Sequence, residues 1–209
     1  MPPAISGADY RGITLAPWPA RWDTRPAMFS VDDLIAECTE AVAEAHPAGA
    51  VREVLERAMR DRAAVASALG PLSRAELAVL HASDELVVLH AVWAPRMRFP
   101  PHDHRTWAVI GIYGGDEENT FYRRGEPGIV EAGARSVREG EVVVLGPEVI
   151  HSVDNPRTHS FTGAIHVYGG PYVTAPRSMW QEPELVERPV SLLSSQALFE
   201  EANRRLVAR

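Results

Sequence analysis

The sequence predicts a mainly β protein, a sandwich or closed barrel with helices packed against its outside. From residue 85 to 172, short β-prone segments follow one another with turn signals between them and no helical pattern, which is typical of sandwiches and barrels. Before residue 85, apolar residues instead recur at helical spacing. With 209 residues, 45% of them hydrophobic, the chain has enough apolar material for one domain with a full core.

Three helices are expected before the barrel. Ser30 can cap a helix over 30–46, since its hydroxyl can accept a hydrogen bond from a free N–H of the first turn. A second apolar stripe predicts a helix over 50–69, and the capping-box pattern Ser73-Arg-Ala-Glu76 predicts a third over 73–80. The apolar stripes need a surface to cover, and the barrel exterior is the large candidate.

We expect one structural domain in three segments: an arm and helices over 1–84, the barrel over 85–172 and a C-terminal extension over 173–209. Residues 1–29 are rich in proline, tryptophan and arginine without any period, which predicts an irregular arm. The extension should close with a helix from Ser194 to Leu206. The expected strands lie around 86–93, 95–104, 107–113, 118–124, 128–138, 141–145, 149–154 and 161–168.

Charge and composition argue against several classes of partner. The net charge of −7 and the absence of a basic run argue against nucleic acid and against an anionic membrane surface. No segment approaches the ~20 apolar residues of a transmembrane helix, and no basic-then-apolar pattern of a secretory signal is present. The single cysteine, Cys38, excludes an internal disulfide. We therefore expect a cytoplasmic monomer or homodimer that acts on a small molecule.

His102 and His104 form the first part of a candidate metal site. Side chains alternate along a strand, so the two imidazoles of this His-x-His pair face the same side. His151 ends a valine-rich segment, after a Gly-Pro turn. A small barrel can bring two such strands together around one cation, and imidazole suits iron, zinc, copper and nickel. Asn155 is expected to order the turn or support the site rather than bind the metal.

These motifs resemble those of the cupin superfamily, whose fold is a double-stranded β-helix, or jelly-roll barrel. The His-x-His pair matches the first cupin motif, and Gly140, His151 and Asn155 match the second in spacing. Most metal cupins add a glutamate ligand after three or four further residues, where this chain has Ala108 and Val109. The resemblance therefore implies a site of three histidines without a carboxylate.

Cupins with three histidines in this layout resemble the cysteine dioxygenase type I family, the thiol dioxygenases, over about 86–172 and the preceding helices. A Ser-x-His-x-Tyr motif follows the third ligand in that family. His166 and Tyr168 match it, whereas its serine is Ala164 here. The resemblance implies Fe(II) as cofactor, with Zn, Ni or Mn open as other divalent metals. It further implies oxidation of a small thiol by O2 to its sulfinate, supported by Tyr168 that His166 orients.

The arginine that binds the substrate carboxylate in that family has no counterpart here, because the corresponding segment, Val79–Asp84, contains no arginine. His81 cannot reproduce the bidentate geometry of a guanidinium. Arg123, on a β-prone segment, and Arg98, which shares sequence parity with His102, are the candidate anchors of the substrate headgroup. The expected substrate is accordingly a small thiol other than L-cysteine, such as 3-mercaptopropionate.

Three other functions stay open on the sequence alone. One is another three-histidine cupin dioxygenase that acts on a substrate without sulfur, such as a diketone. The second is a metal-dependent isomerase or hydrolase that uses Zn or Mn as a Lewis acid. The third is a non-enzymatic cupin that binds a metal or ligand. His166 and Tyr168 weigh against the third, because a barrel that only holds a metal has no evident need of them.

Overall fold

The structure, a computed structural model, describes residues 29–126 and 128–207. Most of the arm expected over 1–29 therefore lies outside the described residues. The helices are α1 (Val31–Ala41), α2 (Pro47–Met59), α3 (Arg62–Leu69) and α4 (Leu192–Val207). The strands are β1 (Glu76–Ala82), β2 (Leu86–Trp93), β3 (Arg98–Asp103), β4 (Ala108–Gly114), β5 (Asp116–Arg124), β6 (Ile129–Arg138), β7 (Val142–Leu145), β8 (Ile150–Asp154), β9 (Thr162–Gly169), β10 (Arg177–Gln181) and β11 (Val186–Val190). None of the described helices has the length and apolar character needed to cross a membrane.

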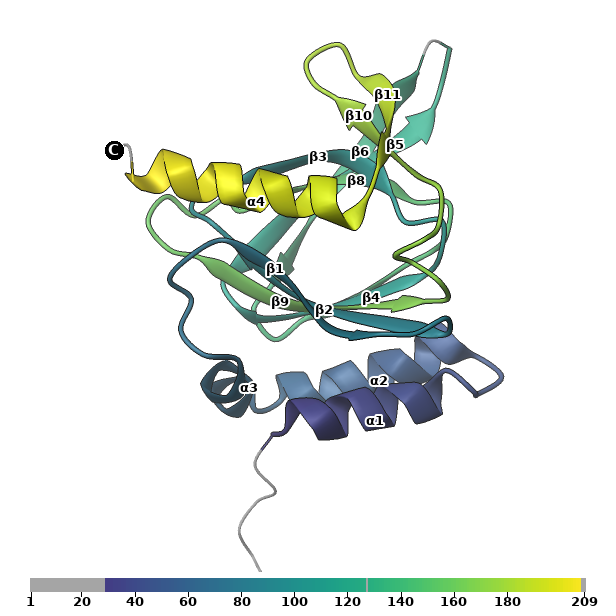
Figure 1. Ribbon diagram of the computed structural model, residues 1–209, viewed down its shortest axis with the longest axis vertical. Helices are drawn as coiled ribbons and strands as arrows, with labels where there is room; N and C mark the ends of the chain where they lie inside the picture. Colours follow the sequence, from purple (N-terminus) through teal and green to yellow (C-terminus); the bar gives the residue numbers. More distant parts are fainter. Residues whose placement is uncertain (1–28, 127, 208–209) are drawn as a thin grey trace, which may run out of the picture.

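Two antiparallel sheets face each other and enclose one interior (Figure 1). The five-stranded sheet has the order β1-β2-β9-β4-β7, and the six-stranded sheet has the order β11-β10-β3-β8-β5-β6. Strands that are distant in sequence alternate in both orders, with β9 between β2 and β4, and β8 between β3 and β5. This is the wrapping of a jelly roll, so the expected mainly β, cupin-type double-stranded β-helix is confirmed.

The inner strands of the five-stranded sheet, β2, β9 and β4, are buried on both faces. In β2, Leu86 and Val88 pack against α1 and α2, whereas Val87 and Leu89 belong to the cluster inside the barrel. Figure 1 shows the N-terminal helices lying across the outer face of this sheet, as expected. A strand alternates its side chains between two faces, and both are covered here, so every residue of the segment 86–93 is buried.

The N-terminal helices differ in detail from the expectation. Ser30 caps α1 as predicted, and its hydroxyl accepts a hydrogen bond of 3.3 Å from the backbone N–H of Asp33. The single helix predicted over 50–69 is wrong, because the segment forms two helices, α2 and α3. The Asp61 carboxylate accepts a hydrogen bond of 3.1 Å from the backbone N–H of Ala64, and this cap starts the second helix.

The helix predicted over 73–80 is also wrong, because most of this segment is strand β1. It pairs antiparallel with β2, from Glu76 opposite Val92 to Ala82 opposite Val87. A capping-box pattern is a weak local preference, whereas the edge of β2 presents a row of backbone N–H and C=O groups that need partners. Pairing with this edge overrides the local helix preference.

The C-terminal part of the chain completes the barrel. β10 and β11 extend the six-stranded sheet beyond the expected barrel range, and β10 lies against β3 with Met179 opposite His102. α4 matches the closing helix predicted over 194–206. It lies on the far side of the barrel from α1 and α2 (Figure 1), and the ring of its Phe199 packs 4.9 Å from that of Trp93.

Candidate metal centre

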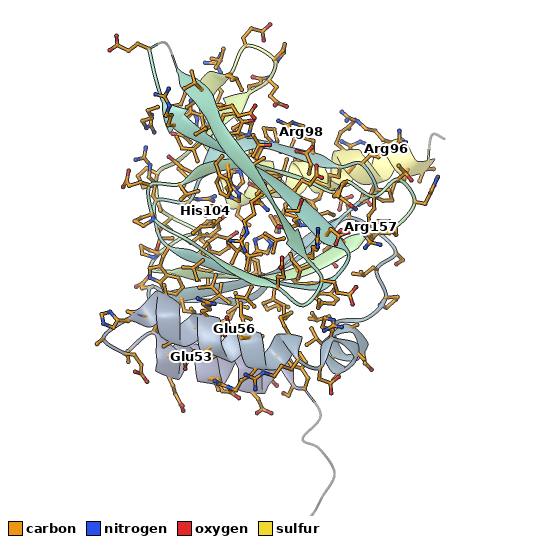
Figure 2. The ribbon with its side chains drawn as sticks, turned by 180° about the vertical axis from the view of Figure 1, so that it is seen from behind. Glu53, Glu56, Arg96, Arg98, His104 and Arg157 are labelled. Carbon is orange, nitrogen blue, oxygen red and sulfur yellow. The ribbon has the colours of Figure 1, made fainter. Side chains whose placement is uncertain are left out.

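Three histidine side chains converge in the barrel interior. Nε2 of His104 lies 3.1 Å from Nε2 of His102 and 3.2 Å from Nε2 of His151. His102 stands opposite His151 in the pairing of β3 with β8, and His104 follows directly after β3. All three are buried, and Figure 2 shows His104 between the two sheets. The sequence-predicted ligands are thus brought together.

The outer ring nitrogens of two of these histidines are held by acceptors. Nδ1 of His102 donates to the carbonyl of Pro100 at 3.0 Å, and Nδ1 of His151 donates to Oδ1 of Asn119 at 2.7 Å. A neutral imidazole carries one proton, so Nε2 of both rings keeps its lone pair toward the common centre. Such partners orient metal-ligating histidines in proteins.

Burial keeps the three imidazoles neutral. It lowers the pKa of His102 to about 3. It also lowers the pKa of His104 and of His151 well below the usual value, and the neighbouring histidines add to this effect. Neutral imidazole is the form that binds metals. Two neutral imidazoles that turn their Nε2 lone pairs toward Nε2 of a third buried imidazole therefore fit a cation.

The spacing of the nitrogens also fits an ion. Ring nitrogens bound about 2.1 Å from one ion, at roughly right angles to each other, lie about 3 Å apart. Among residues 29–126 and 128–207, the group of side chains that could hold a metal consists of His102, His104 and His151, all buried. Its donor set of three imidazoles suits iron, zinc, copper or nickel better than magnesium or calcium.

A cavity of about 20 Å³ adjoins the three histidines, which is room for about one water molecule. Its lining combines aromatic and apolar side chains with imidazole, phenol and hydroxyl groups: Leu77, Trp93, Phe99, His102, His104, His151, Val153, His166, Tyr168, Tyr172, Ser195 and Phe199. A substrate larger than water therefore requires that at least one lining side chain move.

Tyr168 and His166 lie together beside the centre, as their parity on β9 predicts. The Tyr168 hydroxyl is 3.0 Å from Nδ1 of His166, and the Tyr168 ring centroid is 5.0 Å from that of His104. Burial raises the pKa of Tyr168 well above its usual value, and neighbouring Tyr172 raises it further. The phenol therefore keeps its proton at neutral pH.

Two buried charged residues near the site carry no motif that marks them in the sequence. The Glu117 carboxylate accepts a hydrogen bond from the Trp93 indole and lies 3.5 Å from Nε2 of His166. The Arg177 guanidinium lies 3.9 Å over the ring of Tyr172, which lines the cavity. A weak signal for Glu117 is its parity with Asn119 on a β-prone segment. Arg177 lies near the site because β10 pairs with β3, and the sequence has no local signal for this pairing.

The two predicted headgroup anchors lie away from the cavity lining. Arg98 donates to the carboxylates of Glu182 and Asp154 and is 38% exposed, and Figure 2 shows it at the periphery. Arg123 is exposed on β5. Their role in substrate binding stays a sequence-based prediction. Asn155 orders the chain as expected, since its amide donates to the carbonyls of Trp93, Ala94 and Ser160.

No family model matches the sequence. Several solved structures are similar to parts of the chain. A DMSP lyase from Ruegeria pomeroyi is 18% identical with a TM-score of 0.46, over 73% of this chain and 98% of the lyase. A protein with a double-stranded β-helix domain from Klebsiella pneumoniae is 12% identical with a TM-score of 0.43, over 54% of this chain and 90% of its own. An RmlC-like cupin family protein from Methanocaldococcus jannaschii is 14% identical with a TM-score of 0.40, over 47% and 84%. None of these likenesses carries a function over to this chain.

Proposed function

We propose that this chain is a non-haem Fe(II) thiol dioxygenase that oxidises a small thiol to its sulfinate with O2. The observation that carries the proposal is the three-histidine centre without a carboxylate, next to the paired Tyr168 and His166. It agrees with the resemblance of these motifs to the cysteine dioxygenase type I family. A cytoplasmic location and assembly as a monomer or homodimer stay predictions from the sequence.

The reaction balances without any further reductant. One thiol and one O2 give one sulfinic acid, R–SH + O2 → R–SO2H. The sulfur loses four electrons and the two oxygen atoms gain them. Fe(II) held by His102, His104 and His151 would bind the thiolate and activate O2. The chain itself supplies three neutral imidazoles, a cavity with room for about one water molecule, and the protonated phenol of Tyr168.

Arg177 supports a thiol that carries a carboxylate as the substrate. Its side chain is 3% exposed, and its Nε and one terminal nitrogen have no hydrogen-bond partner among the described residues. The buried carboxylate of Asp103 is engaged by Arg105 and by the backbone N–H of Ser178. A buried guanidinium without a partner is costly, and its planar fork matches a carboxylate. A mercaptocarboxylate such as 3-mercaptopropionate would satisfy both the metal centre and Arg177.

Oxygen consumption by the Fe(II)-loaded protein across a panel of small thiols tests the proposal. The panel contains 3-mercaptopropionate, L-cysteine and cysteamine. We expect uptake of one O2 per sulfinate formed, with both atoms of labelled ¹⁸O2 in the product and the highest kcat/KM for 3-mercaptopropionate. If no thiol stimulates uptake, a cupin dioxygenase for a diketone-type substrate takes precedence. Turnover of a substrate without O2 would instead indicate an isomerase or hydrolase. Metal binding without any turnover would indicate a non-enzymatic cupin.

A further inference from the structure

Strand β5 presents two polar side chains, Glu117 and Asn119, to the barrel interior. They are 0% and 1% exposed, and because they are two residues apart on a strand they share one face. Asn119 accepts the hydrogen bond from His151 described above. Glu117 lies beside His166. One strand face thus contacts both a candidate metal ligand and the histidine that adjoins Tyr168.

Glu117 and the neighbouring His166 each have one buried polar atom without a hydrogen-bond partner among the described residues. Oε1 of Glu117 accepts a hydrogen bond from Nε1 of Trp93 and lies 3.5 Å from Nε2 of His166. Its Oε2 and Nε2 of His166 have no hydrogen-bond partner among the described residues. No lysine or arginine of the described residues forms an ion pair with this carboxylate. A buried carboxylate needs donors, and besides the Trp93 indole the ring of His166 lies next to it.

This contact determines which nitrogen of His166 carries the proton. Oε1 of Glu117 already accepts the hydrogen bond from Trp93 and can only accept from a ring nitrogen as well, so the contact favours the hydrogen of His166 on Nε2. An imidazole with its one hydrogen on Nε2 accepts at Nδ1, and the neighbour of Nδ1 is the Tyr168 hydroxyl at 3.0 Å. In this arrangement Tyr168 donates a hydrogen bond to His166, and the Nε2–H of His166 faces Glu117 at 3.5 Å. Lone pairs of the phenol oxygen remain available toward the cavity.

Apart from Tyr168, strand β9 places no polar side chain two residues from His166 that could be its second hydrogen-bond partner. Ala164, two residues earlier on the same face of β9, carries no polar group. β9 belongs to the five-stranded sheet, whereas β5 belongs to the six-stranded sheet. The second partner of His166 therefore comes from across the barrel interior.

We propose that Glu117 is a positioning residue: it holds His166 as the Nε2–H tautomer and thereby holds the Tyr168 hydroxyl beside the metal centre. Asn119, two residues further along β5, holds the ring of His151 in the same way, by accepting a hydrogen bond from its Nδ1. The kinetic consequence rests on the proposed thiol dioxygenase function, whereas the tautomer does not.

The tautomer is measured directly by NMR on metal-free protein labelled with ¹⁵N-histidine, with the His166 signals assigned from their loss in His166→Gln. In the native chain we expect the proton on Nε2 and an unprotonated Nδ1. In Glu117→Gln, which keeps the side-chain shape and the acceptor for Trp93 but removes the charge, we expect a mixture of tautomers. A proton on Nδ1 in the native chain, or the same single tautomer in both proteins, would overturn the proposal. If the variant does not fold, a proton on Nδ1 in the native spectrum still overturns the proposal.

Kinetics of the Fe(II)-loaded protein show whether Glu117 acts through Tyr168. For Glu117→Gln we expect kcat about tenfold lower, with KM and iron content unchanged. In a Tyr168→Phe background the same substitution should cause no further loss, because the two residues act in one chain of hydrogen bonds. Glu118→Gln, an exposed neighbour on the other face of β5, is the matched control and should match the native enzyme.

An equal loss in both backgrounds, or a loss that follows iron content, would show that Glu117 is merely structural. Absence of thiol oxidation by the native protein would defeat the proposed function, and the tautomer would still decide the role of Glu117.

Discussion

The guanidinium of Arg177 lies 3.9 Å over the ring of Tyr172. The Tyr172 ring in turn stacks on Tyr168 at 3.8 Å and has its centroid 6.1 Å from that of His104. Arg177 is two residues before Met179, which stands opposite His102, so both side chains point to the face that carries the metal centre. The ring of Tyr172 therefore separates the guanidinium of Arg177 from the cavity. A carboxylated substrate, as proposed above, would have to displace this ring to reach Arg177.

Replacing Arg177 with glutamine should weaken binding of a carboxylated thiol. A hydrogen bond to a charged group contributes about 1.5–3 kcal/mol, so we expect KM for 3-mercaptopropionate to rise roughly 10- to 100-fold. The value for cysteamine, which has no carboxylate, should change little. Steady-state oxygen uptake with both thiols measures this. Arg123→Gln is the control at an exposed position. A larger effect from Arg123 than from Arg177 would restore the anchor predicted from the sequence.

Asn119→Ala should weaken metal binding without removing a ligand. The substitution deletes the acceptor that fixes the His151 ring at 2.7 Å, and loss of such a partner typically costs 10- to 100-fold in metal affinity. Competition with a chromophoric chelator measures the dissociation constant for zinc or Fe(II). Asn203→Ala is the control, because among the described residues the Asn203 amide bonds only to the backbone of Ala75. Equal affinities in native protein and Asn119→Ala would mean that His151 is oriented by its packing alone.

The three-histidine cluster could be predicted because its information is local. The parity of His102 and His104, and the turn before His151, are visible within a few residues of sequence. The same holds for the pair His166 and Tyr168 on one strand face. Strand alternation alone places each pair on one side, whatever the rest of the fold does.

The partners of these residues could not be predicted in the same way. Glu117 reaches His166 from the opposite sheet, and Arg177 enters the site only because β10 pairs with β3. Such pairings join strands far apart in the chain, and their register has no local signature. The error over 73–80 has the same origin, since the edge of β2 determined the structure of that segment.

Tyr168→Phe should lower turnover and leave the metal content nearly unchanged. Phenylalanine keeps the stacking on Tyr172 but removes the hydroxyl beside His166. A positioned proton donor or acceptor typically contributes 10²- to 10⁴-fold, and we expect kcat to fall by about 10²-fold. Iron content and oxygen uptake are measured on the same sample. Tyr113→Phe is the matched control, because this buried tyrosine bonds His90 in the cluster outside the barrel interior. Equal turnover in native protein and Tyr168→Phe would make the Tyr168–His166 pair structural.

The metal-free protein should lose stability as the pH falls below about 6.5. An unfolded histidine has a pKa of about 6.5, whereas burial lowers the pKa of folded His102 to about 3. Between these values the unfolded chain binds a proton that the folded chain does not, so acid favours unfolding. At pH 5 this difference in proton binding lowers the free energy of unfolding by about 2 kcal/mol for each such histidine.

Urea unfolding at pH 7.5 and 5.0 measures this change in the free energy of unfolding. His102→Gln should reduce the pH dependence by about that amount, whereas His159→Gln, at an exposed position, should not. Identical pH dependence in native protein and His102→Gln would show that His102 titrates normally in the folded chain.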